Sequence, residues 1–459
     1  MVSNNPATSV GVRVGLLAVT TLLLVLGQVA AAFGHSGNES YVYLDVYDTS
    51  VEGRVEYPVN DLNEVLGTQF PKNADRALVA AEENRELLHE YSEEHLAMSG
   101  QDGAEWPIVF GDLETLGAPG GAYIIVNFEV DREFTDVPRS FTVAYDGIIH
   151  AKPERDALLI IGTDWGSGTF NNEASELLRF TSDQTVRTVD LGATSFWSGF
   201  TGVILLGAEH IRIGSDHILF ILALLLPSVL VFSKLAGWQP AASFGSGLWR
   251  VLKIVTMFTV AHTITLTLGG LGVVEFPPAL VETIIAASII LAALHNLKPI
   301  FANKEWIIAF VFGLFHGFGF AGLLSDLGLT QSRQFVSLLG FNLGIELGQA
   351  LIILMIFPAL YIARRTRAYV PAMRVGSVLL IAIASVWVLD RALGVELDID
   401  QWVFAVVLWP RSALVIAAFY VVAVALYAFD KRRDALIPVA SRETPVRVGE
   451  TSLADERAG

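Results

Sequence analysis

The feature that most constrains this chain is a succession of long apolar segments in its C-terminal half. A transmembrane helix needs about 20 mainly apolar residues to cross the hydrocarbon core, so these segments predict a polytopic α-helical bundle. We expect seven spans, at 215–233, 251–271, 279–297, 305–325, 335–362, 375–393 and 412–429. The preceding segment, 195–214, is also apolar and continues directly into the first span. We interpret it as an amphipathic helix on the membrane surface rather than an eighth crossing.

Residues 35–194 have the composition of an ordinary exported domain. Short segments in this region alternate with the two-residue period of β-strands, at 41–46, 123–130, 140–145, 157–162 and 186–191. A Glu-rich helical stretch over 73–98 interrupts them. The pattern predicts an extracytoplasmic β-sandwich-like domain with a helical insertion. It contains no catalytic motif, and we expect its histidines, His89, His95 and His150, at the surface.

The two ends of the chain are expected to lie outside these folded parts. Residues 1–34 have the pattern of a signal peptide, because Arg13 precedes an apolar stretch and small residues follow it. Cleavage after Ala32 or after Gly34 fits the pattern. The second cut would leave His35 as the new N-terminus, able to chelate copper, or simply as the start of a short disordered segment. Residues 430–459 are expected to form a disordered cytoplasmic tail.

The orientation follows from the basic residues of the loops. One side of the predicted bundle carries Lys234, Arg250, Lys253, Lys298, Lys304, Arg364, Arg365, Arg367, Arg374, Lys431, Arg432 and Arg433. The opposite loops carry only Arg333, Arg391 and Arg411, among several acidic residues. The positive-inside rule therefore places the N-terminal domain outside the cell and the C-terminus in the cytoplasm. The signal peptide predicts the same topology, that of a multi-pass protein of the inner (cytoplasmic) membrane.

Composition excludes several classes of function. The formal net charge is −17, and no basic stripe offsets it, which argues against a nucleic-acid partner. The chain contains 0 cysteines, which excludes disulfides, zinc–thiolate sites and thiol catalysis. Any metal ligand must therefore be an imidazole, a carboxylate or an amide oxygen. Such ligands suit nickel, cobalt, zinc, copper or manganese.

Ionisable and amide side chains recur within the apolar segments, where each charged one costs about 2.5–3.5 kcal/mol. The candidate metal ligands are His210, Asp216, His217, His262, Glu282, His316, Asn342 and Glu346. At about 1.5 Å of rise per residue, those inside the spans lie ~3 Å to ~16 Å below the outer surface. Five spans thus place polar groups in the outer half of the bilayer, which predicts a shared cavity open to the outside.

Two residue spacings support the prediction of a shared cavity, whereas the pair His295-Asn296 is not expected to belong to it. Asn342, Glu346 and Gln349 recur at helical spacing and share one helix face. Gly313 and Gly317 are spaced for close helix contact beside His316. The pair His295-Asn296 lies about 20 Å from Glu282, at the inner end of the third span, and is interpreted as helix termination.

These motifs resemble the HupE/UreJ family of membrane proteins, in particular its larger members with an N-terminal extracytoplasmic domain. His210-x5-Asp216-His217 is similar to the His-x5-Asp-His element of the family's nickel and cobalt permeases. Phe315-His316-Gly317 is similar to its later His-Gly element. Segments 260–263, 313–321 and 341–349 look like the pattern of the larger members. The resemblance implies a membrane protein that handles nickel or cobalt.

Three hypotheses follow for the function. The first is uptake or sensing of a divalent transition metal, secondary or channel-like because no nucleotide-binding motif is present. His210, Asp216 and His217 would then bind the ion first, His262, Glu282, His316 and Glu346 would hold it midway, and Asn342 would add or orient a ligand. The second is an intramembrane zinc hydrolase with Glu282 or Glu346 as general base and Ser288 as an accessory. The third is a non-catalytic anchor whose exported domain, 35–194, binds a protein partner.

Overall fold

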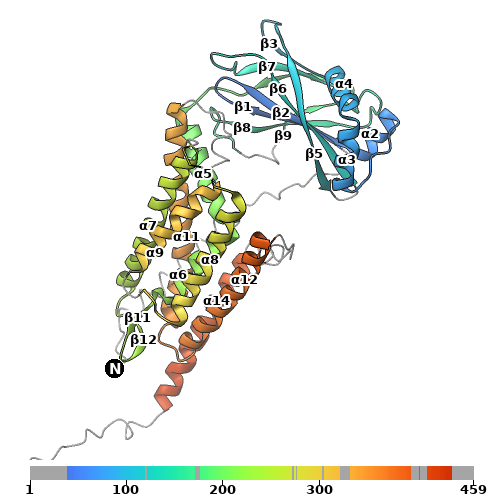
Figure 1. The fold of residues 1–459 in the computed structure, drawn as a ribbon. Helices are drawn as coiled ribbons and strands as arrows, with labels where there is room; N and C mark the ends of the chain where they lie inside the picture. Colours follow the sequence, from blue (N-terminus) through green and yellow to red (C-terminus); the bar gives the residue numbers. More distant parts are fainter. Residues whose placement is uncertain are drawn as a thin grey trace, which may run out of the picture.

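A computed structural model describes residues 39–118, 121–170, 176–270, 273–274, 276–301, 304–320, 331–393, 403 and 411–436. A β-rich N-terminal domain lies at one end of a bundle of long helices (Figure 1). The segment expected to be a signal peptide, 1–34, lies outside the described residues. So does most of the expected tail, although the last helix continues past residue 429 to Leu436.

The N-terminal domain contains two sheets. The larger has the strand order β5-β6-β2-β1-β8-β9, in which β1 and β8 are parallel and the other neighbours antiparallel. Its strands are β1 (Ser40–Val46), β2 (Val51–Pro58), β5 (Ile108–Ala118), β6 (Gly121–Val130), β8 (Ala157–Asp164) and β9 (Glu176–Phe180). The smaller, antiparallel sheet has the order β10-β7-β3-β4. Its strands are β3 (Leu96–Gly100), β4 (Glu105–Trp106), β7 (Ser140–Tyr145) and β10 (Val186–Asp190).

Both sheets contribute to one hydrophobic core, in which Val42 and Val55 of the larger sheet join Phe141 and Val143 of the smaller one. Three helices accompany the sheets: α2 (Val59–Leu66), α3 (Ala74–Glu83) and α4 (Arg85–His95). The β-rich domain and its helical insertion were thus predictable from the sequence, whereas α2, β2, β3, β4, β5 and β9 were not. Of the three histidines expected at the surface, only His150 is exposed. His89 and His95 are half-buried, and His95 bonds to Asp146 at 2.7 Å.

The C-terminal part consists of long apolar helices, as the hydropathy pattern predicted. They are α5 (Phe196–Ile213), α6 (Ser215–Ser228), α7 (Phe244–Gly270), α8 (Pro278–Leu297), α9 (Glu305–His316), α11 (Gln331–Ala363), α12 (Tyr369–Leu393) and α14 (Arg411–Leu436). Among the described residues, five helices are long and apolar enough to cross a membrane, or up to six if α5 and α6 form one broken span. The chain is therefore a multi-pass membrane protein, but the count of seven spans is not confirmed.

Two predicted spans are shorter in the structure than expected. Helix α6 ends one residue after Pro227, which cannot donate a helical hydrogen bond. Strand β11 (Leu230–Ser233) occupies the rest of the predicted first span and pairs in a hairpin with β12 (Gly237–Pro240), which lies beyond it. Helix α9 has 12 residues and passes into a 3-10 turn at Gly317–Phe320.

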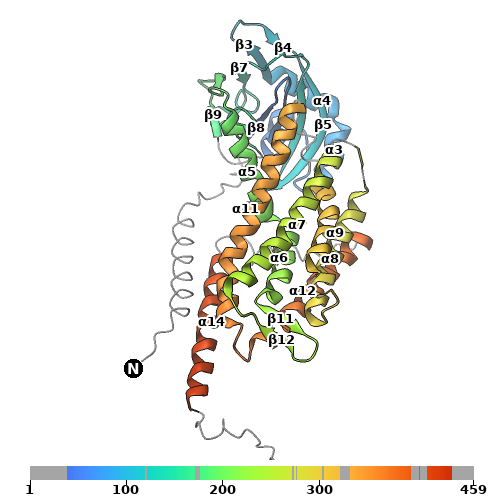
Figure 2. The same cartoon turned by 90° about the vertical axis from the view of Figure 1, so that its left-hand side faces the viewer.

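Helix α5 packs along the half of α11 that lies nearer the N-terminal domain (Figure 2). A Cβ added to Gly207 of α5 would lie 2.0 Å from the Phe341 carbonyl oxygen. One added to Gly344 of α11 would lie 2.0 Å from the Ile204 carbonyl oxygen. The two backbones are thus in direct contact, a form of packing typical of membrane helices. The face of α5 that carries the glycines is buried against α11. Whether α5 lies on the membrane surface is not tested by this contact, so that interpretation stays a prediction.

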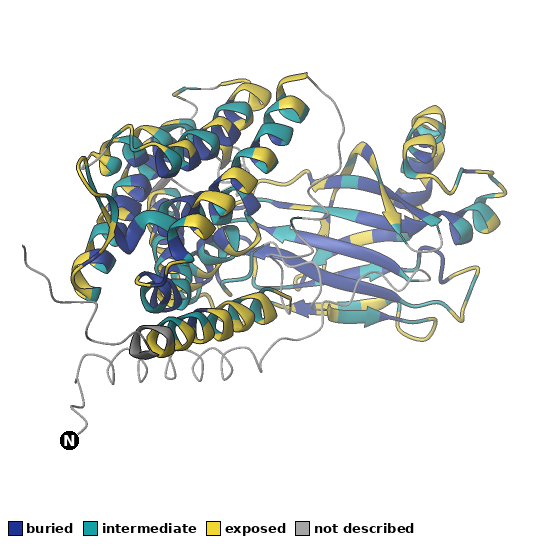
Figure 3. Ribbon diagram, turned by 90° about the horizontal axis from the view of Figure 1, so that it is seen from below, coloured by how far each residue is buried: buried dark blue, intermediate teal, exposed yellow. Residues whose placement is uncertain are grey.

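Much of the outside of the bundle is exposed (Figure 3). Many of the exposed side chains are large and apolar, among them Leu414, Val421 and Phe429 of α14. A surface of this size is unfavourable in water but natural in contact with lipid. Helices satisfy most of their backbone hydrogen bonds internally, which the bilayer requires. The burial pattern therefore agrees with the membrane assignment.

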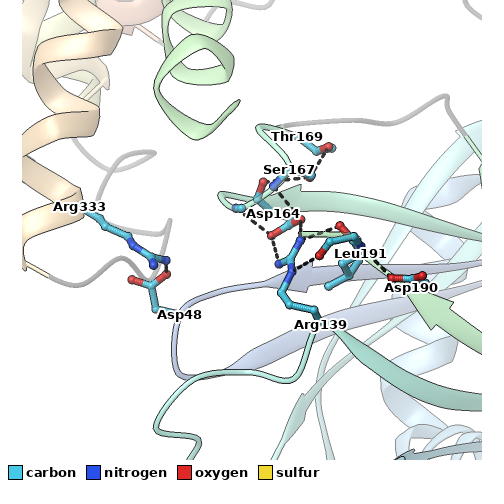
Figure 4. Close-up of polar contacts among 10 residues, drawn as sticks. Asp48, Arg139, Asp164, Ser167, Thr169, Asp190, Leu191 and Arg333 are labelled. Atoms are coloured by element: carbon cyan, nitrogen blue, oxygen red, sulfur yellow. Dashed lines mark hydrogen bonds and ion pairs between the residues drawn. The ribbon is translucent and has the colours of Figure 1, made fainter. Parts of the chain in front are cut away.

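The N-terminal domain is joined to the bundle by contacts with α5 and α11. Arg333, in the first turn of α11, forms an ion pair with Asp48, which follows β1 (Figure 4). The Arg333 guanidinium also lies 4.9 Å from the centre of the Trp165 ring, and the Trp165 indole N–H donates to Ser337 Oγ at 3.1 Å. Gly168 belongs to the turn after β8 that also contains Trp165, and it lies against α5. A Cβ added to Gly168 would lie 2.2 Å from the Ser198 carbonyl oxygen.

A buried ion pair holds the turn that follows β8. Arg139 donates two hydrogen bonds of 2.7 Å to the carboxylate of Asp164 (Figure 4), whose side chain is only 2% exposed. Burial alone would raise the pKa of Asp164, but the hydrogen bonds from Arg139 and Ser167 hold it below its ordinary value. Since the folded-state pKa is the lower one, the stabilisation is complete above about pH 4 and is lost as pH falls through that folded pKa.

Replacing Arg139 by methionine is therefore expected to destabilise the protein by about 3–5 kcal/mol at neutral pH, because an uncompensated buried carboxylate remains. The loss should shrink in acid, where Asp164 becomes protonated. Denaturant unfolding of the full-length protein, followed by tryptophan fluorescence at pH 7 and at low pH, measures both effects. The matched control is Arg85→Met, which removes a surface pair worth about 0–1 kcal/mol. Equal losses for the two variants at neutral pH would contradict the role of the Arg139 pair.

Candidate metal centre

Four imidazoles and one carboxylate meet where α5, α6, α7 and α9 come together. His210 lies near the end of α5, Asp216 and His217 begin α6, His262 lies on α7 and His316 ends α9. One donor atom from each of His210, His217 and His262 lies within 4.8 Å of the others. The same is true of Asp216, His217 and His316. His217 belongs to both groups, and we call the five residues the imidazole cluster.

A break in the chain brings the first members of this cluster together. In one continuous helix, His210 and His217 would lie about 10.5 Å apart along the axis. Instead the chain bends by 72° between α5 and α6, at Gly214. The two imidazole rings then meet edge to face, with their centres 4.8 Å apart. The short element His-x5-Asp-His thus forms a site because it spans a bend.

Glycines on α9 bring the second half of the cluster into place. A Cβ on Gly313 would lie 2.3 Å from the Phe258 carbonyl oxygen, and one on Gly317 would lie 2.4 Å from the His262 carbonyl oxygen. Helices α7 and α9 therefore touch backbone to backbone, as the spacing of these glycines predicted. The contact sets His316 beside His217, at 5.2 Å between ring centres.

The cluster is buried at its centre and open at one edge. His217, His262 and His316 are buried side chains. Asp216 keeps about a fifth of its side chain exposed, at 20%, and His210 is half-buried. Both of these residues lie at the α5–α6 bend, so this bend is the accessible side of the cluster.

The hydrogen bonds of His262 leave one of its nitrogens free to bind a ligand. Its Nδ1 lies 3.3 Å from the side-chain oxygen of Asn342, whose amide nitrogen donates to the Leu338 carbonyl at 2.8 Å. Because the Asn342 oxygen can only accept, Nδ1 of His262 carries the proton and Nε2 keeps a lone pair. That Nε2 is buried and has no hydrogen-bond partner among the described residues.

The same reasoning applies to His316 and His217. Ser288 Oγ donates to the Ile285 carbonyl at 2.7 Å, so it accepts from Nε2 of His316 at 3.3 Å. Nδ1 of His217 lies 3.0 Å from the Asp216 carboxylate, which can only accept. The lone pairs left over are on Nδ1 of His316 and Nε2 of His217, again buried and without a partner in the described part of the chain.

Three buried nitrogen lone pairs without partners are unfavourable by themselves, at about 1–3 kcal/mol each. His217 shares one donor group with His262 and the other with His316, so a cation bound beside His217 would relieve part of that penalty. Each imidazole also has a hydrogen-bonded neighbour that fixes its tautomer and ring orientation, the arrangement found around metal-bound histidines. The donor set of the imidazole cluster therefore fits a divalent transition metal.

Two of the carboxylates predicted as ligands lie outside the imidazole cluster. Glu282 is half exposed, at 50%, and its carboxylate lies 3.6 Å from Arg391 of α12. Glu282 thus faces α12, where the positive charge of Arg391 offsets its negative charge. Glu346 accepts a 2.6 Å hydrogen bond from Thr256 Oγ1, and Gln349 accepts one of 3.0 Å from Thr259. The polar face of α11 thus contacts α7, but only Asn342 reaches the cluster.

The contact between Ser288 and His316 was not anticipated from the sequence. Ser288 was considered only as an accessory in a hydrolase, although it faces another direction than Glu282, and not as a partner of His316. Its depth carried the missing signal: six residues below Glu282, it lies at ~15 Å, close to the ~13 Å estimated for His316.

Comparison with known proteins supports the resemblance seen in the motifs. Residues 185–391 match the family model described as HupE / UreJ protein. The matched region begins at the last strand of the N-terminal domain and includes every residue of the imidazole cluster. Searches among curated proteins and among solved structures gave no match.

Proposed function

We propose that this chain, whose residues 185–391 match the HupE / UreJ family model, transports a divalent transition metal, nickel or cobalt first. The observation that carries the proposal is the set of unpartnered nitrogens on His217, His262 and His316. Neutral imidazoles suit these ions, and the absence of cysteine disfavours metals selected by thiolates.

The geometry suggests a role for each residue of the imidazole cluster. His210 and Asp216, at the accessible bend, bind the ion first. His217, which belongs to both donor groups, then holds it together with His262 on one side and His316 on the other, after it has lost most of its water. Asn342 and Ser288 orient two of these imidazoles without binding the ion. One carboxylate neutralises the ion only in part, which favours release over permanent storage.

The sidedness of the site is part of the proposal. With the N-terminal domain outside the inner membrane, the imidazole cluster lies toward the exterior and suits capture of a scarce ion. The N-terminal domain rests on α5 and α11, which carry His210 and Asn342. It is therefore placed to influence the bend through which the ion arrives, or to receive a protein partner that delivers it.

A second candidate function, an intramembrane zinc hydrolase, is favoured by one contact. Ser288 Oγ lies 3.3 Å from Nε2 of His316, close enough to assist a reaction at a zinc-bound water. In that case Asp216 would be the nearby carboxylate, since Glu282 and Glu346 point elsewhere. The third hypothesis, a pure anchor, leaves the unpartnered nitrogens without a purpose.

Uptake into vesicles tests the proposal. The purified protein is reconstituted in liposomes that contain a metal-sensitive dye, and nickel or cobalt is added outside. We expect saturable uptake by the wild type, loss of uptake in His316→Ala, and near-normal uptake in Glu282→Ala, which changes a residue outside the cluster. Tightly bound zinc without any uptake would favour the hydrolase instead. A protein that binds no metal at all would leave only the anchor.

A further inference from the structure

A second feature lies below the imidazole cluster, at the end of the bundle far from the N-terminal domain. A cavity of about 40 Å³ opens there between α6, α7, α8 and α9. Its lining is mostly apolar and includes Phe220, Phe312 and Ala292. The titratable lining residues, Arg250, His295 and Glu305, lie near the ends of α7, α8 and α9, which we take as its mouth. A volume of this size holds about three water molecules. We call it the inner cavity.

Only one layer of aromatic rings separates the inner cavity from the imidazole cluster. Phe220 lines the cavity, and its ring centre lies 5.6 Å from that of His316 on the other side. The Phe220 ring also contacts Phe258 at 5.2 Å and Phe312 at 6.0 Å. Phe258 in turn lies 4.9 Å from His316. The three phenylalanines form an aromatic barrier, of which Phe220 alone touches both the cluster and the cavity among the described residues.

The polar groups at the mouth suit a departing cation. His295 accepts hydrogen bonds from the backbone N–H groups of Ile300 and Phe301 on Nδ1, at 3.2 Å each. Its other nitrogen therefore carries the proton and faces Glu305 at 3.9 Å. Both nitrogens of His295 are thus engaged at the end of α8, in agreement with its interpretation as a helix-terminating residue. Glu305 is therefore the group at the mouth that can attract a cation. Arg250 is held aside by two backbone carbonyls, those of Pro227 and Leu230.

We propose that the inner cavity is the second half of the metal route and that Phe220 is the gate between the two halves. This inference rests on the proposed transport function. A divalent ion cannot be stripped of ligands over a long apolar distance, because burial of an unpaired charge is very unfavourable. A barrier one ring thick keeps that distance short. Rotation of the Phe220 ring lets the ion pass from His316 to the water of the cavity and on to Glu305.

Cysteine labelling tests the route, since the native chain contains 0 cysteines. Ala292→Cys places a thiol in the inner cavity, and Leu294→Cys places one on the lipid-facing side of the same helix. The probe is a charged, membrane-impermeant thiol reagent, applied from either side of oriented vesicles. From the side opposite the N-terminal domain, Ala292→Cys should react at least about tenfold faster than Leu294→Cys, because thiolates form in water. No reaction at Ala292→Cys from that side would overturn the cavity's role.

The gate is tested by adding Phe220→Ala to the Ala292→Cys variant. We expect the thiol to react from the side of the N-terminal domain as well, and to do so only when Phe220 is changed. Nickel binding by the same double variant shows that the protein has folded, and Phe220→Leu serves as a milder second variant. Continued protection in both variants would refute Phe220 as the gate. Labelling requires no transport, so normal labelling without nickel uptake would count against the proposed function and leave the cavity's accessibility intact.

Discussion

Replacing His217 by alanine is expected to lower the affinity for nickel and cobalt by more than about 100-fold. His217 is the one side chain shared by both donor groups of the imidazole cluster. Loss of a residue that merely orients a ligand already costs about 10- to 100-fold in metal affinity. Loss of a shared ligand should therefore cost more. Removal of His217 also leaves the carboxylate of Asp216 without its 3.0 Å hydrogen bond.

Isothermal titration of the purified protein in detergent measures this effect. His295→Ala is the matched control, because it removes an imidazole of similar burial at the other end of the bundle. We expect the control to bind nickel as the wild type does. Similar affinities for His217→Ala and the wild type would show that the cluster is not the binding site.

The second large effect is expected from Gly313→Val, which changes no ligand. A Cβ at this position would lie 2.3 Å from the backbone oxygen of Phe258, and backbone cannot move aside as a flexible side chain can. Helices α7 and α9 must then separate, and His316 moves away from His217 and His262. Overpacking of this kind costs about 1–3 kcal/mol in stability. We expect metal affinity to fall about as far as in His316→Ala.

Gly245→Ala is the control for this substitution. Gly245 lies on α7, and a Cβ there would have no atom within 4 Å among the described residues. Alanine also favours the helix by about 1 kcal/mol relative to glycine. Unfolding and nickel titration of both variants give the comparison. If Gly313→Val bound nickel normally, close contact between α7 and α9 would not be what forms the site.

The sequence predicted the membrane bundle and most of the imidazole cluster for simple reasons. Hydrophobic length and helical rise are local properties, so they place His262 and His316 at a common depth without any knowledge of packing. The glycines at 313 and 317 report close helix contact in the same local way. The family motifs point to the same residues. The depth of a residue along its helix can therefore be predicted from the sequence alone.

The direction in which a side chain points around its helix could not be predicted in this way. Glu282 lies at a suitable depth, yet it turns toward Arg391, which is 109 residues away in the sequence. The ion pair of Asp48 with Arg333 joins residues 285 positions apart and left no local signal. The end of α6, one residue after Pro227, could have been predicted from that proline. The apolar residues that follow it made the span look longer.

Together these contacts suggest how the two parts of the chain work as one. The N-terminal domain is joined to α5 and α11 through Trp165, Gly168 and Arg333. Those helices carry His210 and Asn342, so a movement of the domain would change the accessible bend and the orientation of His262 together. The N-terminal domain thus rests on two of the helices that carry residues of the site.

The most direct test is X-ray absorption spectroscopy of the nickel-loaded protein. The account expects a first shell of nitrogen and oxygen atoms only, with the outer-shell scattering of about three imidazoles at the usual metal–nitrogen distance of about 2.0–2.1 Å. The imidazole contribution should fall in His217→Ala and His316→Ala and persist in Glu282→Ala. A spectrum of fully hydrated nickel in the wild type, or one unchanged in all three variants, would contradict the claim that these histidines form a metal centre.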